Sequence, residues 1–188
     1  MSKRVFIIHG WGGKPDEHWI PWLKSQLEAK GFEVLVPAMP DTDEPIIDKW
    51  VNRLSEIVGE LDEQTNFIGH SIGCQTIMRY LATQEGKKAG TCVFIAGWFK
   101  LENLESAEEE RIAAPWLKDD IDFQKVLSVT KKFIVINSSN DNYGAVTENQ
   151  NLFEQNLGAK VTILPNKGHF TAVDGIIKLP EVLAALSV

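Results

Sequence analysis

Short apolar runs alternate along the chain with longer segments in which apolar residues recur every three or four positions. The runs have the length of buried strands and lie at residues 5–8, 34–36, 67–68, 92–96, 133–136 and 161–164. The segments between them follow the period of a helix, most clearly where Trp50, Leu54 and Val58 succeed one another. Strands that alternate with helices pair in parallel and are covered by helices on both faces. The pattern therefore predicts an α/β fold, a three-layer α/β/α sandwich around a mostly parallel sheet of about six strands.

One segment, residues 98–117, interrupts this alternation between the fourth predicted strand and the next helix. It is rich in glutamate, with three consecutive glutamates before Arg111. Charged segments of this kind are typical of a solvent-exposed excursion. The position after a strand also fits a small cap over a pocket, because open α/β sheets bind ligands at the carboxyl ends of their strands. The sequence alone is compatible with both interpretations.

Length and composition limit the classes of function. With 188 residues, the chain is expected to form a single domain over residues 1–188. A net charge of −7 and a pI of about 5.1 argue against a nucleic-acid-binding surface, which is basic. No apolar stretch approaches the roughly 20 residues of a membrane span, and Cys74 and Cys92 form no metal-binding or disulfide pattern. We therefore expect a cytoplasmic protein without a membrane anchor, a nucleic-acid partner or a bound metal.

Residues 69–73 read Gly-His-Ser-Ile-Gly and match the pattern G-x-S-x-G. The match follows a predicted strand and precedes a predicted helix, which is the context of a nucleophile elbow. In such a turn the serine hydroxyl is raised above the edge of the sheet, and the flanking glycines allow strand and helix to approach each other. Ser71 is therefore the candidate nucleophile. The alternative is an ordinary strand-to-helix turn in which Ser71 caps the helix.

A serine hydroxyl is a weak nucleophile and needs a base that is oriented by an acid. Of the four histidines, His169 lies in a loop just after the last predicted strand, where it can reach over Ser71. Asp141 is the only carboxylate in the loop after the fifth predicted strand. The order Ser71, Asp141, His169, with each residue after a strand, predicts a catalytic triad. Asp174, which follows His169 closely, is the rival acid.

A tetrahedral intermediate also needs preorganised N–H donors. One is expected from the backbone of Ile72, the residue after the candidate nucleophile. The other is expected from residues 9–13, His-Gly-Trp-Gly-Gly, which resemble the HGGG-type loop of esterases. The backbone N–H of Trp11 is the candidate donor in this loop. A phosphate-binding loop is the alternative, but it would require a pattern such as G-x-G-x-x-G, which residues 9–13 do not continue.

These motifs occur in one order along nearly the whole chain. Together they resemble the small serine hydrolase family of retinoblastoma-binding protein 9 and its bacterial relatives. The resemblance implies a compact α/β-hydrolase fold, a triad of Ser71, Asp141 and His169, and at most a small cap. The chain departs from the family at Asn142, where the family tends to have proline after the acid. The residues that carry the resemblance are 9–11, 18–23, 69–73, 139–141, 168–170 and 179–182.

The sequence thus predicts a carboxylesterase-like serine hydrolase that cleaves a small acyl ester through an acyl-enzyme and needs no cofactor. The same triad could serve an aminopeptidase, an amidase or a thioesterase, and a non-catalytic binding protein on a hydrolase fold is a further alternative. An aromatic pocket wall and a short excursion at residues 98–117 favour short acyl groups over long ones. The candidate substrate-binding residues are aromatic and lie at strand ends or in irregular segments: Trp98, Phe99, Trp116 and Phe170.

Overall fold

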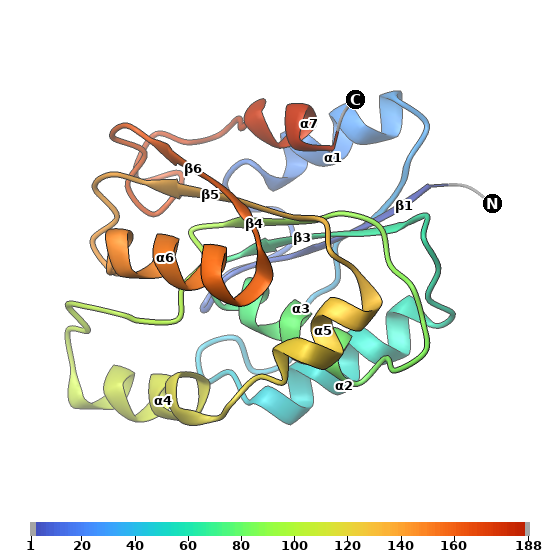
Figure 1. Ribbon diagram of the computed structural model, residues 1–188. Coiled ribbons are helices and arrows are strands. Elements are labelled where there is room, and N and C mark those ends of the chain that lie inside the picture. The colour runs from blue at the N-terminus through green and yellow to red at the C-terminus, as the bar shows by residue number, and fades with distance from the viewer. Residues whose placement is uncertain (1–2, 187–188) are drawn as a thin grey trace.

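The computed structural model describes residues 3–186 and contains one sheet of six parallel strands (Figure 1). Along the sheet the strands are ordered β2-β1-β3-β4-β5-β6, so the chain starts one strand in from one edge, adds β2 at that edge, and then crosses to the other edge. This confirms the predicted α/β architecture, and every strand pairing is parallel. The strands are β1 (Arg4–Ile8), β2 (Glu33–Leu35), β3 (Thr65–His70), β4 (Cys92–Ile95), β5 (Phe133–Ser138) and β6 (Lys160–Leu164).

Helices cover both faces of the sheet (Figure 1). In the view of Figure 1, α1 and α7 pack above the sheet, whereas α2, α3, α5 and α6 pack below it, with α4 farther out on the same side. Each helix of the described chain is too short or too polar to span a lipid bilayer. The helices are α1 (Ile20–Ala29), α2 (Ile47–Val58), α3 (Ile72–Ala82), α4 (Ala107–Lys118), α5 (Phe123–Val129), α6 (Val146–Leu157) and α7 (Glu181–Ala185).

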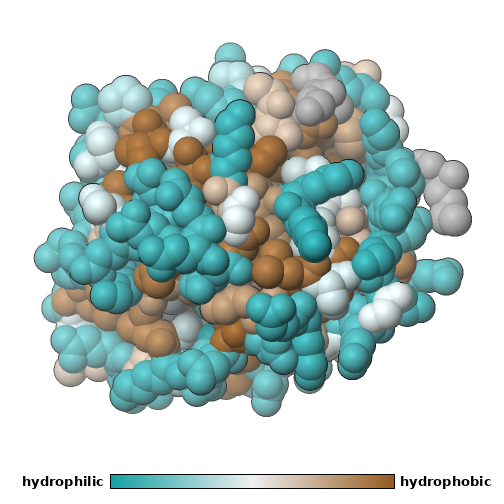
Figure 2. Space-filling model, viewed as in Figure 1, coloured by the Kyte–Doolittle hydropathy of each residue, from teal (hydrophilic) through white to brown (hydrophobic). Residues whose placement is uncertain are grey.

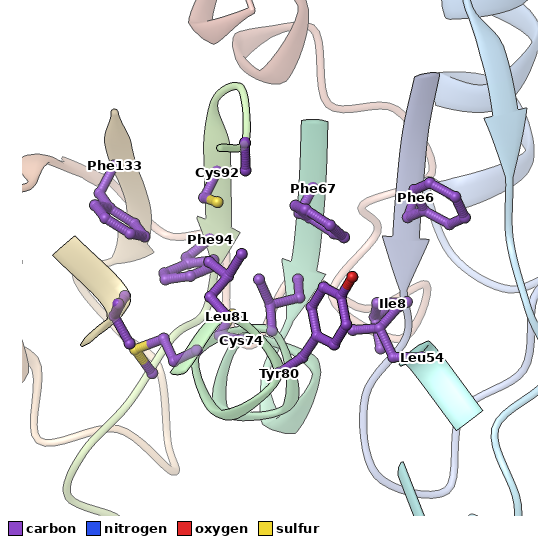
Figure 3. Packing of buried hydrophobic residues seen from close by; sticks show 14 of the residues in the cluster. Phe6, Ile8, Leu54, Phe67, Cys74, Tyr80, Leu81, Cys92, Phe94 and Phe133 are labelled. Atoms are coloured by element: carbon purple, nitrogen blue, oxygen red, sulfur yellow. The ribbon is translucent and has the colours of Figure 1, made fainter. Parts of the chain in front are cut away.

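Alternate residues of the strands serve opposite faces of the sheet, as the two-residue period of a strand requires. In β1, Phe6 and Ile8 belong to the apolar cluster that includes α2 and α3, whereas Val5 and Ile7 belong to the cluster that includes α1. Both faces of β1 are therefore buried, which explains why its sequence is a continuous apolar run. Figure 3 shows the first cluster, in which neighbouring strands contribute a row of aromatic side chains: Phe6, Phe67, Phe94 and Phe133.

The outer helices show the complementary pattern. Asn149, Phe153 and Leu157 of α6 are buried toward the sheet, and Figure 2 shows hydrophilic side chains over the opposite, outer face of this helix. A helix on the outside of a sandwich needs this division because one stripe is buried and the other faces water.

The register of the sheet brings the carboxyl ends of the central strands to the same end of the sheet. Ile8 is aligned with Gly69, His70 with Ile95, and Ile95 with Ile136. The loops after β1, β3, β4 and β5 therefore meet at this carboxyl-terminal end of the sheet. These loops carry most of the residues that the sequence analysis selected.

The segment between β4 and α5 differs most from the predicted pattern because it contains a regular helix, α4. The helix begins after Ser106, whose Oγ accepts a hydrogen bond from the backbone N–H of Glu109 at 3.1 Å. Three glutamates in the first turn are favourable next to the positive end of the helix dipole. The sequence contains this signal, since Ser106 and Glu109 match the capping box S-x-x-E. The acidic run thus marks the start of a helix.

Candidate active site

Ser71 lies in a strained turn between β3 and α3. Its backbone has φ 52° and ψ −120°, a conformation that costs energy for any residue with a side chain. The glycines on either side are required by close backbone contacts. A Cβ on Gly73 would lie 2.3 Å from the carbonyl oxygen of Ile8, and a Cβ on Gly69 would lie 2.7 Å from the backbone nitrogen of Cys74. Strand and helix are therefore packed so closely that neither glycine can carry a side chain, and Ser71 lies at the tip of the turn.

His169 lies in the loop that follows β6, which we call the histidine loop (residues 166–174). Its Nδ1 is 2.9 Å from both carboxylate oxygens of Asp141, in the loop after β5. Since a carboxylate only accepts, Nδ1 carries a proton and Nε2 is left as the free ring nitrogen. The Asp141 side chain is only 4% exposed and that of His169 15%. This pairing joins two residues from the loops that follow the neighbouring strands β5 and β6, at the same end of the sheet.

The rival carboxylate, Asp174, shapes the histidine loop instead of contacting the imidazole. Its Oδ2 accepts hydrogen bonds from the backbone N–H of His169 at 3.0 Å and from the N–H and hydroxyl of Thr171 at 2.9 and 2.7 Å. A Cβ on Gly168 would lie 2.0 Å from Asp174 Oδ1, and Gly168 has φ 53°. Glycine is therefore needed before His169, because a side chain at this position would occupy the space of the Asp174 carboxylate.

Two further histidines hold the histidine loop in place. His70 Nε2 donates to the backbone carbonyl of His169 at 2.8 Å, and His18 Nδ1 accepts from the backbone N–H of Ala172 at 3.0 Å. Burial, together with nearby His169, lowers the pKa of His70 to about 3. Burial also lowers the pKa of His18. Both rings are therefore neutral at pH 7, and sequence analysis gave neither of them this role.

Ser71 and His169 open into one cavity of about 580 Å³. The Ser71 hydroxyl oxygen accepts a hydrogen bond from the indole N–H of Trp98 at 3.3 Å, and the Tyr143 ring stands edge-on to the His169 ring, with centroids 5.2 Å apart. Within residues 3–186, no three His, Cys, Asp or Glu side chains gather in a way that could hold a metal ion. Apart from these residues, the cavity wall includes an apolar group, Leu101, Leu104 and Ile112, and a charged group, Lys14, Asp43, Glu108 and Glu109.

The two candidate backbone donors lie on the elements that border this cavity. Ile72 is the first residue of α3, where backbone N–H groups have no acceptor within the helix. Trp11 lines the cavity from the loop after β1. The buried ring of His9 fixes this loop, because its Nδ1 donates to the carbonyl of Gly10 at 2.9 Å and its Nε2 accepts from the backbone N–H of Met39 at 3.2 Å.

Three of the four aromatic residues predicted to bind substrate do not line the cavity, and that part of the prediction is corrected. Phe170 is fully buried in the cluster on the α1 face. Phe99 turns away and packs on Phe153, with ring centroids 4.4 Å apart. Trp116 is buried on the inner side of α4, where its indole N–H donates to the carbonyl of Pro45 at 3.0 Å. The apolar side chains of these three residues pack in the core. Of the four predicted residues, only Trp98 lines the cavity.

The apolar wall that the sequence analysis missed is aliphatic. Leu101 and Leu104 precede α4, and Ile112 lies within it. A helix starting after Ser106 would have placed Ile112 one turn before the buried Trp116, on the inward-facing side. The capping box at Ser106 was thus the signal from which part of this wall could have been found.

Comparisons with known proteins show the family of this chain. A family model described as serine hydrolase matches residues 5–188. The Bacillus subtilis (strain 168) protein YdeN is 31% identical over 189 residues, which cover 100% of this chain and 96% of that protein. The crystal structure of the ydeN gene product matches with a TM-score of 0.88 and 29% identity, over 98% of this chain and 97% of that chain. Serine hydrolase RBBP9 of Rattus norvegicus is 27% identical over 173 residues, 90% of this chain and 87% of that protein.

More distant structures share the fold. Est1E from Butyrivibrio proteoclasticus matches with a TM-score of 0.70 at 15% identity, over 98% of this chain and 88% of that chain.

Proposed function

The chain belongs to the serine hydrolase family, and we propose that it cleaves a small acyl ester with Ser71, His169 and Asp141 as a catalytic triad. The observation that carries the proposal is the pairing of His169 Nδ1 with both oxygens of Asp141 at 2.9 Å. It leaves the other ring nitrogen free at the cavity into which the strained Ser71 also opens. A buried acid, an oriented imidazole and a hydroxyl that lines the cavity are the three parts that acyl transfer needs.

In the proposed reaction, Ser71 Oγ attacks the carbonyl carbon while His169 Nε2 takes the hydroxyl proton. The proton then passes to the leaving alcohol, which gives the acyl-enzyme, and a water molecule repeats the sequence to release the acid. Asp141 holds the imidazole in the required tautomer and stabilises the imidazolium. The backbone N–H groups of Ile72 and Trp11 bind the oxyanion. These steps require no cofactor.

The proposed substrate has a short, apolar acyl group. Leu101, Leu104, Ile112 and the Trp98 ring form an apolar wall, and each buried methylene contributes about 0.8 kcal/mol. We propose that α4 and the residues before it act as a small cap that closes this side of the cavity. A cavity of about 580 Å³ beneath such a cap suits acyl chains of about two to six carbons better than long ones.

The charged part of the cavity favours a second candidate, amide or aminoacyl-ester hydrolysis on the same triad. Asp43, Glu108 and Glu109 outnumber Lys14 in the wall, so a cationic group on the substrate is attracted and an anionic substrate such as an acyl-coenzyme A is repelled, more strongly at low salt. Matched ester and amide substrates, each with and without a free amino group, separate the two candidates by their kcat/KM values.

Labelling with a fluorophosphonate probe tests the nucleophile. We expect the wild-type protein to be labelled and Ser71→Ala to remain unlabelled. With p-nitrophenyl butyrate, Ser71→Ala and His169→Ala should each lose at least about 10³-fold in kcat, because triad residues act as a unit. A Ser71→Ala protein that is folded by circular dichroism and keeps near-normal turnover would exclude the proposed mechanism.

A series of p-nitrophenyl esters from acetate to palmitate tests the substrate class. We expect kcat/KM to be highest within about two to six acyl carbons and to fall for longer chains, because the cap limits the length that can be buried. A steady rise to the longest chains would contradict the proposed small pocket and would indicate an open groove.

A further inference from the structure

The four residues from Gly97 to Lys100, which follow β4 after one intervening residue, are held by three buried carboxamide side chains from three different elements. These are Gln75 of α3, Asn137 of β5 and Asn149 of α6, which are 1%, 4% and 0% exposed. Such groups are costly to bury unless their hydrogen bonds are satisfied, and here the satisfying partner is the same short stretch of main chain each time. This segment is therefore fixed more firmly than its irregular backbone alone would allow.

The individual bonds satisfy six of the eight polar main-chain atoms of the segment. Asn137 exchanges two hydrogen bonds of 3.0 Å with the N–H and carbonyl of Gly97. Asn149 Oδ1 accepts from the N–H groups of Phe99 and Lys100 at 2.8 and 2.9 Å, and its Nδ2 donates to the Lys100 carbonyl at 2.9 Å. Gln75 Nε2 donates to the Trp98 carbonyl at 2.5 Å.

Trp98 is the residue whose side chain this arrangement orients. Its ring is 2% exposed, and the indole N–H donates to Ser71 Oγ at 3.3 Å. Trp11, Trp50 and Trp116 use their indole N–H groups differently, because each donates to a main-chain carbonyl. Trp98 thus directs a buried, uncharged donor at the enzyme's own oxygen that forms and breaks a covalent bond in the proposed reaction.

We propose that Trp98 is a catalytic residue that stabilises negative charge on Ser71 Oγ, and that Gln75, Asn137 and Asn149 position it. The inference rests on the proposed function of Ser71. As the Oγ–H proton moves to His169 Nε2 and the bond from Oγ to the carbonyl carbon forms, negative charge develops on Oγ. It develops there again when the acyl-enzyme is hydrolysed, because the C–Oγ bond breaks and its electron pair returns to Oγ before His169 returns the proton. The indole N–H keeps its own proton in both steps.

The Trp98 indole differs from the proposed oxyanion donors in the oxygen atom to which it donates its hydrogen bond. Ile72 and Trp11 are proposed to bind the substrate carbonyl oxygen, whereas Trp98 contacts the enzyme's own oxygen. In the acyl-enzyme, Oγ is an ester oxygen and a poor acceptor, so the buried N–H regains a good partner only when the ester is cleaved. The indole therefore favours completion of the second half-reaction, whereas in the first it acts only while negative charge develops on Oγ.

Replacement of Trp98 by β-(3-benzothienyl)alanine, introduced at this position alone, tests the inference most directly. Sulfur then replaces the N–H group while the shape of the ring pair is kept. We expect kcat on p-nitrophenyl acetate, butyrate and hexanoate to fall by the same factor, about 10- to 100-fold, the range that a hydrogen bond to a charged group corresponds to. KM should change by less than about twofold, and the rate of fluorophosphonate labelling should fall in parallel with kcat.

Three encoded variants complete the experiment. Trp98→Phe also removes the N–H, and it should reproduce the chain-length-independent loss. Leu104→Ala is the matched control for a residue that only forms the wall, and it should change kcat/KM by a factor that grows with acyl length. Gln75→Leu keeps the size of the positioning residue but removes its bond to the Trp98 carbonyl and the bond that it accepts from Arg79, and we expect a kcat loss that is smaller than that of Trp98→Phe and independent of the acyl group.

The outcomes separate this inference from the proposed function. If Ser71→Ala abolishes turnover but the benzothienyl protein keeps wild-type kcat and labelling rate, the inference is wrong and the proposed function stands. A loss confined to KM, or one that grows with acyl length as in Leu104→Ala, would likewise overturn it and reduce Trp98 to a wall residue. If Ser71→Ala itself keeps turnover, both fail together.

Discussion

The Ser71 turn and the histidine loop face each other across one cavity, but they are held by different forces. The turn is fixed by backbone packing between β1, β3 and α3, where Gly69 and Gly73 leave no room for a side chain. The histidine loop is fixed by side-chain hydrogen bonds, from Asp174 within the loop and from His18 and His70 elsewhere in the sequence. His18 is more than 150 residues away from the amide it binds, as its bond to Ala172 shows.

This difference has a physical consequence. Backbone packing in the core is insensitive to pH and tolerates almost no change of residue, because any added atom meets main chain. Hydrogen bonds from side chains can be removed one at a time, and those from histidine depend on protonation. We therefore expect the turn to fail through loss of folding and the histidine loop to fail through loss of activity.

Substitution of Asp141 should give the largest effect on activity. Asp141→Asn replaces the carboxylate that binds His169 Nδ1 and allows the wrong tautomer, so kcat should fall by roughly 10³- to 10⁴-fold while the free energy of unfolding changes little. Ester hydrolysis and urea denaturation of the same preparation measure both quantities. An active Asp141→Asn protein would show that another group orients the imidazole.

Substitution of Gly73 should give the largest effect on folding. Gly73→Ala places a Cβ 2.3 Å from the Ile8 carbonyl oxygen, so strand and helix must separate, and we expect a loss of more than about 3 kcal/mol in the free energy of unfolding. Gly158→Ala is the matched control, because Gly158 has a left-handed backbone (φ 60°, ψ 29°) but a Cβ at this position would meet no atom within 4 Å. It should lose only about 1 kcal/mol. Equal losses in the two variants would contradict the packing argument.

The free energy of unfolding should depend on pH through His70, the residue that links the Ser71 turn to the histidine loop. Its pKa is about 3 in the folded protein and 6.5 in the unfolded chain, so below pH 6.5 the unfolded state binds a proton that the folded state does not. The stability that neutral His70 contributes is complete above pH 6.5 and is lost as the pH falls from 6.5 toward 3. Between pH 7 and pH 4 this loss should amount to about 2–3 kcal/mol.

Urea denaturation of wild type and His70→Gln across this pH range isolates the contribution, because glutamine can also donate to the His169 carbonyl but does not titrate. We expect a shallower decline in the variant. Identical slopes would mean that carboxylates elsewhere account for the whole acid sensitivity.

The smallest effect should come from Asp174. Asp174→Asn keeps an oxygen that can accept from the loop amides but loses its charge, so we expect a loss of about 1 kcal/mol in stability and a decrease in kcat of less than about tenfold. The comparison of kcat values with Asp141→Asn is the decisive measurement. If Asp174→Asn were the more damaging of the two, the roles of the carboxylates would have to be exchanged.

The sequence was most informative where local geometry restricts the choice of residue. The six apolar runs became the six strands, and the family resemblance drawn from short motifs is confirmed by the match over residues 5–188. Glycines next to Ser71 have a recognisable spacing because the turn is made by neighbouring residues.

Long-range polar contacts leave no such mark. The Asn149 side chain binds main-chain atoms 49 and 50 positions away, and an isolated asparagine in a helix has no periodic signal. The direction of a loop side chain is equally hidden. Phe170 follows His169 directly, yet with its own φ of 59° it turns into the core while His169 faces the cavity. Only the folded arrangement distinguishes such neighbours.

The attachment of α4 matters for how substrate preference can change. Arg111 pairs with Glu44 at 2.5 Å, and Trp116 donates to the carbonyl of Pro45, so the helix is joined to the loop before α2 by contacts at its inner and outer sides. None of the six strands relies on α4 for pairing. The residues of this helix that face the cavity can therefore be varied in a directed-evolution library while the scaffold and the chemistry are kept. In natural lineages the same separation allows specificity to diverge without a new fold having to arise.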